Sequence, residues 1–321
     1  MAPGFVHDTP RLAAVPAFPV RPEPANPRFP LGTRTLRLDR QVAVMAIVNR
    51  TPDSFFDRGR TFALDAALGH AMAQVDAGAD IIDVGAVKAG PGEPVEQSEE
   101  QERVVAFVEA FTAGCDVPVS VDTFRPAVAQ AALAAGACLV NDVSGLADPE
   151  MADVVAASPG AALVVMHAGG PVRTRPFRPD YLPDVTTVVV SACRRLAQQA
   201  IDRGVAPGRI VVDPGHDFGK NTQHSIELTR GLPALAALGY PVLVALSRKD
   251  FLGEITGGGL DHGAAPPDQR LEASLACAAV SVLLGANIVR VHDTAATVRA
   301  VRVAEAVAGM RLPAVSLRGL D

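Results

Sequence analysis

The chain has 321 residues, of which 49% are hydrophobic and 20% are charged, and its 29 Lys and Arg against 35 Asp and Glu give a formal net charge of −6. This composition is typical of a folded globular protein rather than of a disordered chain. The mild acidity argues against a nucleic-acid partner held by a general basic field. No apolar run approaches the roughly 18 residues of a membrane span, so we expect no membrane partner.

The first 36 residues are rich in proline, which fixes φ and removes a backbone donor. A helix or a central strand is therefore not expected there. We predict a flexible, disordered leader over residues 1–36 and a single domain over residues 37–321. The leader contains no apolar stretch of signal-peptide length, and the four cysteines lack the spacing of a disulfide framework or a zinc site, so we expect a cytoplasmic protein.

From Val42 onward, short apolar runs alternate with Ala-rich segments of helical spacing. The runs predict strands at Val42–Val48, Ile81–Val84, Val119–Val121, Leu139–Val140, Ala162–Met166, Ile210–Val212, Val242–Leu246 and Ile288–Val291. The segments between and after them predict helices at Ala66–Ala77, Glu99–Phe111, Ala127–Ala135, Met151–Ala157, Val185–Arg203, Ser225–Leu238, Leu271–Leu284 and Ala296–Ala308. Such alternation indicates a parallel sheet covered by helices.

Several predicted helices end at a glycine just before the next strand, as expected of left-handed C-terminal caps. These glycines are Gly78, Gly136, Gly204, Gly239 and Gly285. Eight β/α units favour an α/β fold of the (β/α)8 TIM-barrel class, with an open doubly wound sheet as the alternative.

Polar side chains follow most of the predicted strands, at the point where each strand ends. In a (β/α)8 barrel the carboxyl ends of the strands meet at one rim, which carries the active site. Stability alone gains nothing from so many polar strand ends, so we predict an active site there. The residues are Asn49, Asp122, Asn141, Asp142, His167, Asp213, Ser247, Arg248, Lys249, Arg290, His292 and Asp293.

Four of these residues suit the edge of a flat heterocycle. Asp122 and Asp213 can only accept hydrogen bonds when ionised, while Asn141 can both donate and accept. An aspartate paired with Lys249 in a dry pocket would keep both groups charged near neutral pH. A pterin or a purine-like ring meets this demand, and a structural ion pair at the barrel mouth is the alternative.

Arg290 and His292 stand two residues apart, so both point to the same side of the last strand. A guanidinium with an imidazole suits a phosphate or diphosphate group, which the last strands of such barrels often hold. A simple bridge between Arg290 and a carboxylate is the alternative.

The segments 49–57 and 85–94 are long and rich in Gly, Pro and Asp, which is typical of loops that close over a substrate or of ordinary surface loops.

Seven short motifs follow one another from the first predicted strand to the last. They read MAIVNRTPDSF at 45–55, ADIIDVG at 79–85, SVDT at 120–123, NDVSG at 141–145, DPGHDFGK at 213–220, SRKDFLG at 247–253 and RVHD at 290–293. In this order they resemble the motifs of dihydropteroate synthases of the folate pathway, over roughly residues 42–310. The resemblance implies a (β/α)8 barrel that joins 6-hydroxymethyl-7,8-dihydropterin diphosphate to para-aminobenzoate and releases diphosphate. It also implies Mg²⁺ as the cofactor, and the family is commonly a homodimer.

Carried over by position, the resemblance gives each motif residue a role. The residues expected to hold the pterin are Asp122, Asn141, Met166, Asp213 and Lys249, of which Asp122 and Lys249 are the expected catalytic pair. Those expected at the diphosphate are Asn49, Arg290 and His292, with Mg²⁺ bridging Asn49 and the leaving group. Those expected on the acceptor side are Phe55, Lys88, Phe218 and Asp250. The family is described as ionising the pterin–oxygen bond before the amine attacks, which the metal, Arg and His would assist by stabilising the departing charge.

The acceptor side departs from the family pattern. The loop after the second strand normally reads GGESTRPG, but residues 85–92 read GAVKAGPG, so Ala89 and Gly90 replace the Thr and Arg that help close the site. Asp250 stands where a Ser is common and would repel a carboxylated acceptor. This combination resembles the second synthase paralogue of actinobacteria, which is often described as lacking synthase activity.

Two functions therefore stay open. The first is an ordinary synthase in which Lys88 or Arg50 takes the place of the missing loop Arg. The second is a pterin-binding paralogue with little or no synthase activity or with a different amine acceptor. A methyltetrahydrofolate methyltransferase barrel is a weaker alternative, because it has no need of the RVHD strand end.

Overall fold

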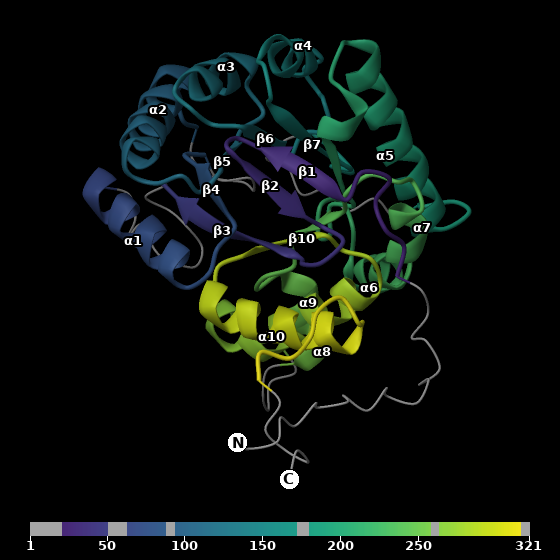
Figure 1. Cartoon of the computed structure of the whole chain (residues 1–321). Coiled ribbons are helices and arrows are strands. Elements are labelled where there is room, and N and C mark those ends of the chain that lie inside the picture. The colour runs from purple at the N-terminus through teal and green to yellow at the C-terminus, as the bar shows by residue number, and fades with distance from the viewer. Residues whose placement is uncertain (1–20, 51–62, 88–93, 172–179, 258–262, 316–321) are drawn as a thin grey trace, which may run out of the picture.

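Eight parallel strands form the centre of the molecule, and helices surround them (Figure 1). The computed structural model describes residues 21–50, 63–87, 94–171, 180–257 and 263–315. The barrel strands are β3 (Ala43–Asn49), β4 (Ile81–Gly85), β5 (Val119–Asp122), β6 (Leu139–Asp142), β7 (Ala162–Met166), β8 (Ile210–Asp213), β9 (Leu243–Val244) and β10 (Ile288–Val291). The helices are α1 (Leu64–Asp76), α2 (Gln97–Gly114), α3 (Pro126–Ala134), α4 (Glu150–Ala157), α5 (Val185–Asp202), α6 (Thr222–Arg230), α7 (Leu232–Ala236), α8 (Asp250–Thr256), α9 (Leu271–Leu283) and α10 (Thr294–Val307).

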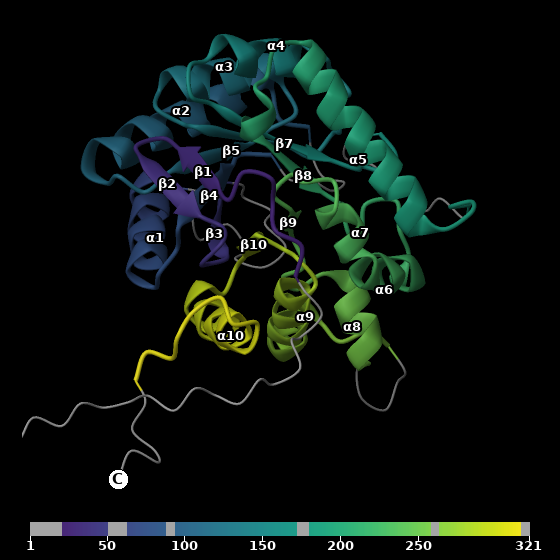
Figure 2. The same ribbon diagram turned by 45° about the vertical axis from the view of Figure 1, so that its right-hand side comes forward.

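The sheet closes into a barrel. Its strand order is β8-β7-β6-β5-β4-β3-β10-β9, and an isolated parallel bridge between Val212 and Val242 joins the two ends. At this seam the backbone N–H of Val212 donates to the carbonyl of Pro241 at 2.9 Å. Figure 2 shows α1 to α5 forming an arc around the strands and α8 to α10 completing the ring. The (β/α)8 barrel expected from the sequence is confirmed, and the open sheet is excluded.

All eight predicted strands are present within a few residues of their expected bounds. The left-handed glycine caps are also present, with φ of +115° at Gly136 and +113° at Gly285. The single helix expected over Ser225–Leu238 is wrong, because the chain forms α6 and α7 with a break at Gly231. Pro233 explains the break, since it has no N–H for the hydrogen bond that would continue α6.

The expectation of a flexible leader is wrong for residues 21–36. The strands β1 (Arg28–Leu31) and β2 (Arg34–Arg37) form an antiparallel hairpin, and Arg21 donates to the carbonyls of Val282 and Ala286. The proline rule excludes a helix or a central strand, but this ribbon has only two strands, so Pro30 fits within it. The leader's residues 1–20 lie outside the described part of the chain.

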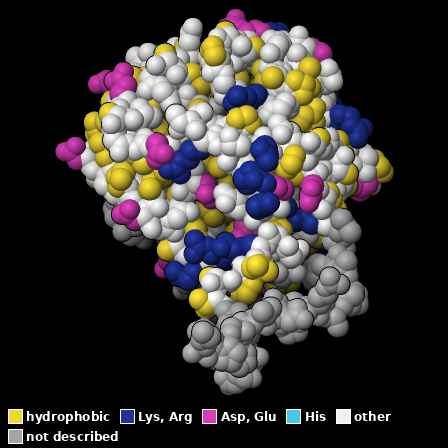
Figure 3. Space-filling model, in the orientation of Figure 1, with side chains coloured by type: hydrophobic (Ala, Val, Ile, Leu, Met, Phe, Trp, Pro, Cys, Tyr) yellow, Lys and Arg dark blue, Asp and Glu magenta, His cyan; other side chains and the backbone are white. Residues whose placement is uncertain are grey.

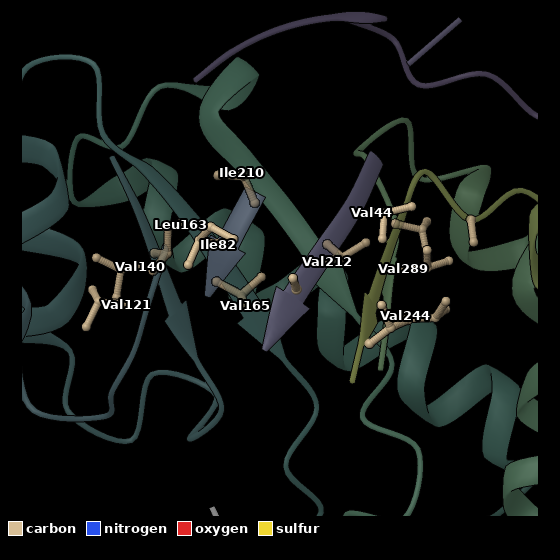
Figure 4. Packing of buried hydrophobic residues seen from close by; sticks show 14 of the residues in the cluster. Val44, Ile82, Val121, Val140, Leu163, Val165, Ile210, Val212, Val244 and Val289 are labelled. Carbon is tan, nitrogen blue, oxygen red and sulfur yellow. The ribbon is translucent and has the colours of Figure 1, made fainter. Parts of the chain in front are cut away.

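Inward and outward side chains alternate along the strands and form two separate apolar clusters. The outward cluster packs against the helices; its members include Val44, Ile82, Val121, Val140, Leu163, Val165, Ile210, Val212, Val244 and Val289 (Figure 4). The inward cluster lies at the amino ends of the strands, and the hairpin seals it with Phe29, Leu31, Leu36 and Leu38. Its barrel members include Ala43, Met45, Ile81, Leu139, Ala162, Val164, Val211, Leu243 and Ile288. The barrel interior is therefore closed by hydrocarbon at this end.

The hairpin end of the molecule presents a mixed surface. In the space-filling view of this face, Lys and Arg side chains gather near the middle and along the lower edge, with Asp and Glu side chains around them (Figure 3). None of the helices in the described ranges combines the length and the apolar character that a membrane crossing requires.

Candidate functional site

The inward positions of the barrel change from apolar to polar toward the carboxyl ends of the strands. Side chains alternate along a strand, so residues two apart share a face. The inward pairs are Ile81 and Asp83, Leu139 and Asn141, Val164 and Met166, Val211 and Asp213, and Ile288 and Arg290. A polar layer therefore lies directly above the hydrocarbon layer, inside the rim where the sequence predicts a site.

Arg290 stands between two buried carboxylates of this layer. Its Nε donates to Asp83 Oδ2 at 2.6 Å and its Nη2 donates to Asp122 Oδ2 at 2.7 Å. Asn141 Nδ2 lies 3.4 Å from the same Oδ2 of Asp83. The alternative of an arginine–carboxylate bridge is thus realised, but with two carboxylates from β4 and β5.

The charges of this cluster are strongly coupled. Burial raises the pKa of Asp122 to about 7; Arg290 opposes this rise, while Asp83 adds to it. Burial alone would lower the pKa of Arg290, but Asp83 and Asp122 outweigh burial and raise it. The guanidinium therefore stays charged, while Asp122 can exchange a proton near neutral pH.

Asp213 and Lys249 lie on the opposite side of the rim, at β8 and just after β9. Asp213 Oδ1 accepts the backbone N–H of Gly215 at 2.7 Å. Burial raises the pKa of Asp213, and the charge of Lys249 opposes the rise. Lys249 donates to the carbonyl of His216, and its Nζ lies 4.8 Å from the centre of the Phe218 ring. The amine is thus held beside an aromatic ring and a carboxylate.

The loop after β8 is anchored by a second, fully buried lysine. Lys220 is 1% exposed, and its Nζ donates to the carbonyls of Gly215 and Phe218 at 2.8 and 2.9 Å. It also lies 2.9 Å from Nδ1 of His167, the residue after β7. Burial, together with the charge of the neighbouring Lys249, lowers the pKa of Lys220 to about 7. This side chain fixes the loop that carries Phe218.

His216, in the same loop, is neutral. It is completely buried, and burial together with the charges of Lys249 and Lys220 holds its pKa well below the usual range. Thr229 donates its hydroxyl hydrogen to the carbonyl of Ser225, so its oxygen accepts from His216 Nε2 at 3.1 Å. The imidazole therefore carries its proton on Nε2 and braces α6 rather than acting as an acid.

Two acidic residues meet near Lys249, where the sequence predicts the acceptor side. Asp217 Oδ2 accepts the backbone N–H of Asp250 at 2.8 Å, at the start of α8. The Asp250 side chain is 58% exposed and pairs with the buried Arg270 at 2.8 Å. This ion pair offsets part of the repulsion that we expected Asp250 to exert on a carboxylated acceptor.

The remaining rim residues brace one another. Arg248 forms two hydrogen bonds with Asp293, at 2.7 and 2.8 Å, and so ties the loop after β9 to the end of β10. His292 Nδ1 lies 3.1 Å from the hydroxyl of Ser247 across the same junction. These contacts hold the RVHD and SRK motifs side by side.

The structure brings most of the expected site residues to one end of the barrel. Asn49 ends β3, and Met166 pairs in register with Asp213 between β7 and β8. Phe55 and Lys88 lie outside the described residues, so their expected places are untested. The expected polar strand end Asp142 points outward instead, where it accepts the backbone N–H groups of Ser144 and Leu146 at 2.8 Å each.

Asp83 is the residue that sequence reasoning missed. It is 0% exposed, and it lies inside the motif ADIIDVG rather than at the end of a predicted strand. The sequence feature that could have identified it is an acid at an inward position of an apolar strand, two residues after Ile81. A buried carboxylate at such a position needs a charged partner, and here that partner is Arg290.

The donor set near Asn49 fits a Mg²⁺ ion carried by a substrate better than a resident metal centre. Among the described residues there is no group of three or more His, Cys, Asp or Glu that could hold a metal. Mg²⁺ prefers oxygen ligands, keeps several waters, and is commonly bound through one or two protein oxygens together with substrate phosphates. The amide oxygen of Asn49 is a suitable oxygen ligand of this kind.

Comparison with known proteins agrees with this geometry. Residues 45–292 match the family described as pterin binding enzyme, so the chain belongs to the pterin-binding enzymes. Within this family it is similar to dihydropteroate synthases. It is 46% identical over 292 residues to the "Inactive dihydropteroate synthase 2" of Mycobacterium leprae, covering 89% of this chain and 97% of that one. It is 42% identical over 264 residues to the "Dihydropteroate synthase" of the same organism, covering 82% and 92%.

Solved structures give the same class. The Xanthomonas albilineans dihydropteroate synthase with 4-aminobenzoic acid is 40% identical, with a TM-score of 0.77 over 88% of this chain and 98% of that one. The Yersinia pestis enzyme in a sulfonamide complex is 37% identical, with a TM-score of 0.81 over 88% and 100%. The recognised family and fold are thereby confirmed.

Proposed function

We propose that this protein binds 6-hydroxymethyl-7,8-dihydropterin diphosphate at the rim of its barrel and transfers the pterin-methyl group to an amine. One observation carries the proposal: the inward residues Asp122, Asn141, Asp213 and Arg290 share one polar layer above a closed hydrocarbon floor. Such a layer offers acceptors, an amide and a cation to one flat ring and its anionic tail.

The pterin ring lies against Met166 and exchanges hydrogen bonds with the carboxylates and the amide of this layer. Lys249 is held close enough to Asp213 for its charge to counter the effect of burial on the Asp213 pKa, which keeps that carboxylate able to accept from the ring. Asn141 Oδ1 supports this placement, because it is buried without a partner among the described residues and a ring N–H would satisfy it.

The diphosphate tail lies toward Asn49, Arg290 and His292. The C–O bond of the pterin methylene breaks, and its electron pair leaves with the diphosphate. The amine nitrogen then forms the new C–N bond and loses a proton. Ionised carboxylates beside the ring stabilise the cation, while Arg290 and His292 stabilise the departing charge. Asn49 would hold Mg²⁺, which would supply further charge neutralisation.

A second candidate is a pterin-binding paralogue that makes little or no dihydropteroate or uses another amine. The acid pair Asp217 and Asp250 beside Lys249 favours it, because two carboxylates oppose the approach of a carboxylated acceptor. The replacement of the loop Thr and Arg by Ala89 and Gly90 favours it too, as does the similarity to a relative named inactive.

The test is a direct assay of product and of binding. Purified protein is incubated with pterin diphosphate, para-aminobenzoate and Mg²⁺, and dihydropteroate is measured by chromatography, with Asp122→Ala as the matched negative control. Product above this control supports the synthase. Calorimetric binding of the pterin diphosphate without product supports the paralogue, and failure to bind it contradicts both.

Two further features complete the proposal. The protein works in the cytoplasm, in keeping with its four free thiols, which are typical of a reducing compartment. It also forms a homodimer, as is common in the family. Valines that are exposed on the outer side of the last two helices, Val280 on α9 and Val303 and Val307 on α10, are available for such an interface.

A further inference from the structure

Both side chains that donate hydrogen bonds to Asp83 in the described part of the chain, those of Arg290 and Asn141, belong to the proposed site. Its hydrogen bonds run from Arg290 Nε at 2.6 Å and from Asn141 Nδ2 at 3.4 Å, and its Oδ1 is buried without a partner in the described residues. Buried ion pairs are often no more stabilising than hydrophobic residues of similar volume. Apolar residues in place of both Asp83 and Arg290 would therefore cost the fold little, so the presence of this buried pair points to a role beyond folding.

The Nε and Nη2 edge of the Arg290 guanidinium donates hydrogen bonds to two different carboxylates. Nε contacts Asp83 on β4, while Nη2 contacts Asp122 on β5, and among the described residues no side chain accepts from Nη1. Asp122 is therefore occupied in the free protein. Nη2 occupies Oδ2 of this carboxylate, so a ring that donates to both carboxylate oxygens, through a ring N–H and an amino group, competes with Nη2 for Oδ2.

We infer that Asp83 is a positioning residue that holds Arg290 at a fixed pivot, so that a ring which takes Asp122 releases Nη2 toward the anionic tail of the same ligand. The inference rests on the proposed function and assigns a part in it to Asp83. Because the hydrogen bond to Asp83 holds Nε in place, the guanidinium can rotate about Nε and stay within the site. Without Asp83, Arg290 has only Asp122 as its anchor and competes with the ring.

The test measures how much the diphosphate tail adds to affinity. Binding of 6-hydroxymethyl-7,8-dihydropterin and of its diphosphate is measured by calorimetry for the wild type and for Asp83→Asn. We expect Asp83→Asn to weaken the diphosphate at least tenfold and the tail-less pterin less than threefold. An equal loss for both ligands, or no loss for either, overturns the inference.

The matched control is Asp80→Asn. Asp80 is a half-buried acid just before the same strand, at the opposite end of the barrel, where it accepts the backbone N–H of Val44 at 2.9 Å. It reports the general effect of removing a partly buried charge next to this strand and should leave the affinity ratio of the two ligands unchanged. Should Asp83→Asn fail to fold, Asp83→Glu displaces the same carboxylate while keeping its charge, and we expect the same selective loss.

A double-mutant cycle distinguishes a role through Arg290 from a general packing role. In an Arg290→Lys background the pivot is already lost, so adding Asp83→Asn should change diphosphate affinity less than threefold. Additive losses overturn the inference while leaving the proposed function intact. A wild type that binds neither ligand overturns both.

Discussion

Lys220 Nζ lies 2.9 Å from His167 Nδ1, so a buried amine joins the end of β7 to the loop after β8. The same amine donates to three main-chain carbonyls, of His167, Gly215 and Phe218.

This lysine predicts a pH-dependent contribution to stability. Its pKa is about 7 in the folded chain, well below the value of about 10.4 for a free lysine. Between these values the unfolded chain binds more protons, so the free energy of unfolding should rise with pH. We expect the difference in unfolding free energy between the wild type and Lys220→Met to grow from pH 7 to pH 9, by up to about 1.4 kcal/mol per unit. Urea unfolding at both pH values measures it, and parallel pH curves would contradict it.

The pterin half of the site should depend on its two proposed catalytic residues. We expect Asp122→Ala and Lys249→Ala each to weaken binding of pterin diphosphate by about 10- to 100-fold, since each removes a charged hydrogen-bond partner. Calorimetry measures the loss. Asp153→Ala is the control, because Asp153 forms an exposed ion pair with Arg203 away from the rim. Normal binding in either site variant would refute the assigned role.

Pterin binding should weaken in acid. Because the pKa of Asp122 is raised to about 7, its carboxyl group is mostly protonated below that pH and can no longer accept from two donors. We expect affinity to fall up to about tenfold per pH unit from pH 7 to pH 5.5, with one proton released on binding. Calorimetry in buffers of different ionisation enthalpy counts that proton. The Asp122→Asn variant should lose the dependence, and an unchanged slope in that variant would assign it to another group.

The acceptor side should regain activity toward para-aminobenzoate when the family residues are restored. We expect Ala89→Thr with Gly90→Arg to raise turnover, and Asp250→Ser to raise it further by removing one of two neighbouring acids. Initial rates at saturating pterin diphosphate measure the effect. Residues 89 and 90 lie outside the described ranges, so this expectation comes from the sequence. If the double replacement has the same initial rate as the wild type, the altered loop does not limit turnover of para-aminobenzoate.

The hairpin should be essential to stability. Phe29 is completely buried against the barrel floor, so Phe29→Ala leaves a cavity and should cost about 3–5 kcal/mol. Chemical unfolding measures the loss. Arg28→Ala, at the exposed neighbouring position, should change stability by less than about 0.5 kcal/mol. Equal effects of the two changes would mean that the hairpin does not seal the core.

Local patterns were sufficient to predict the barrel. Apolar β-branched runs, glycine caps and polar strand ends all depend on near neighbours in the chain, and each gave the correct element. The same patterns placed Asp122, Asn141, Asp213 and Arg290 at one end of the barrel, because parallel strands bring their carboxyl ends together.

Long-range contacts explain what was missed. The hairpin depends on Phe29 and Leu31 meeting side chains from distant strands, and proline dominates the local signal there. The role of Asp83 becomes visible only through its hydrogen bond with Arg290, which is 207 positions away in the chain. The break between α6 and α7 could have been read from Pro233, because its missing N–H is a local property.

The hydrocarbon floor and the polar rim share the same strands but face different constraints. Phe29, Met45 and Ile288 lock the lower half in place, so changes there endanger folding. The polar side chains of the rim, such as Asp122 and Asn141, do not belong to this hydrocarbon cluster. Evolution can therefore exchange one co-substrate for another, or silence the reaction, by editing a few loop positions while the barrel persists unaltered. Active and inactive members of such a lineage can thus diverge without a loss of barrel stability.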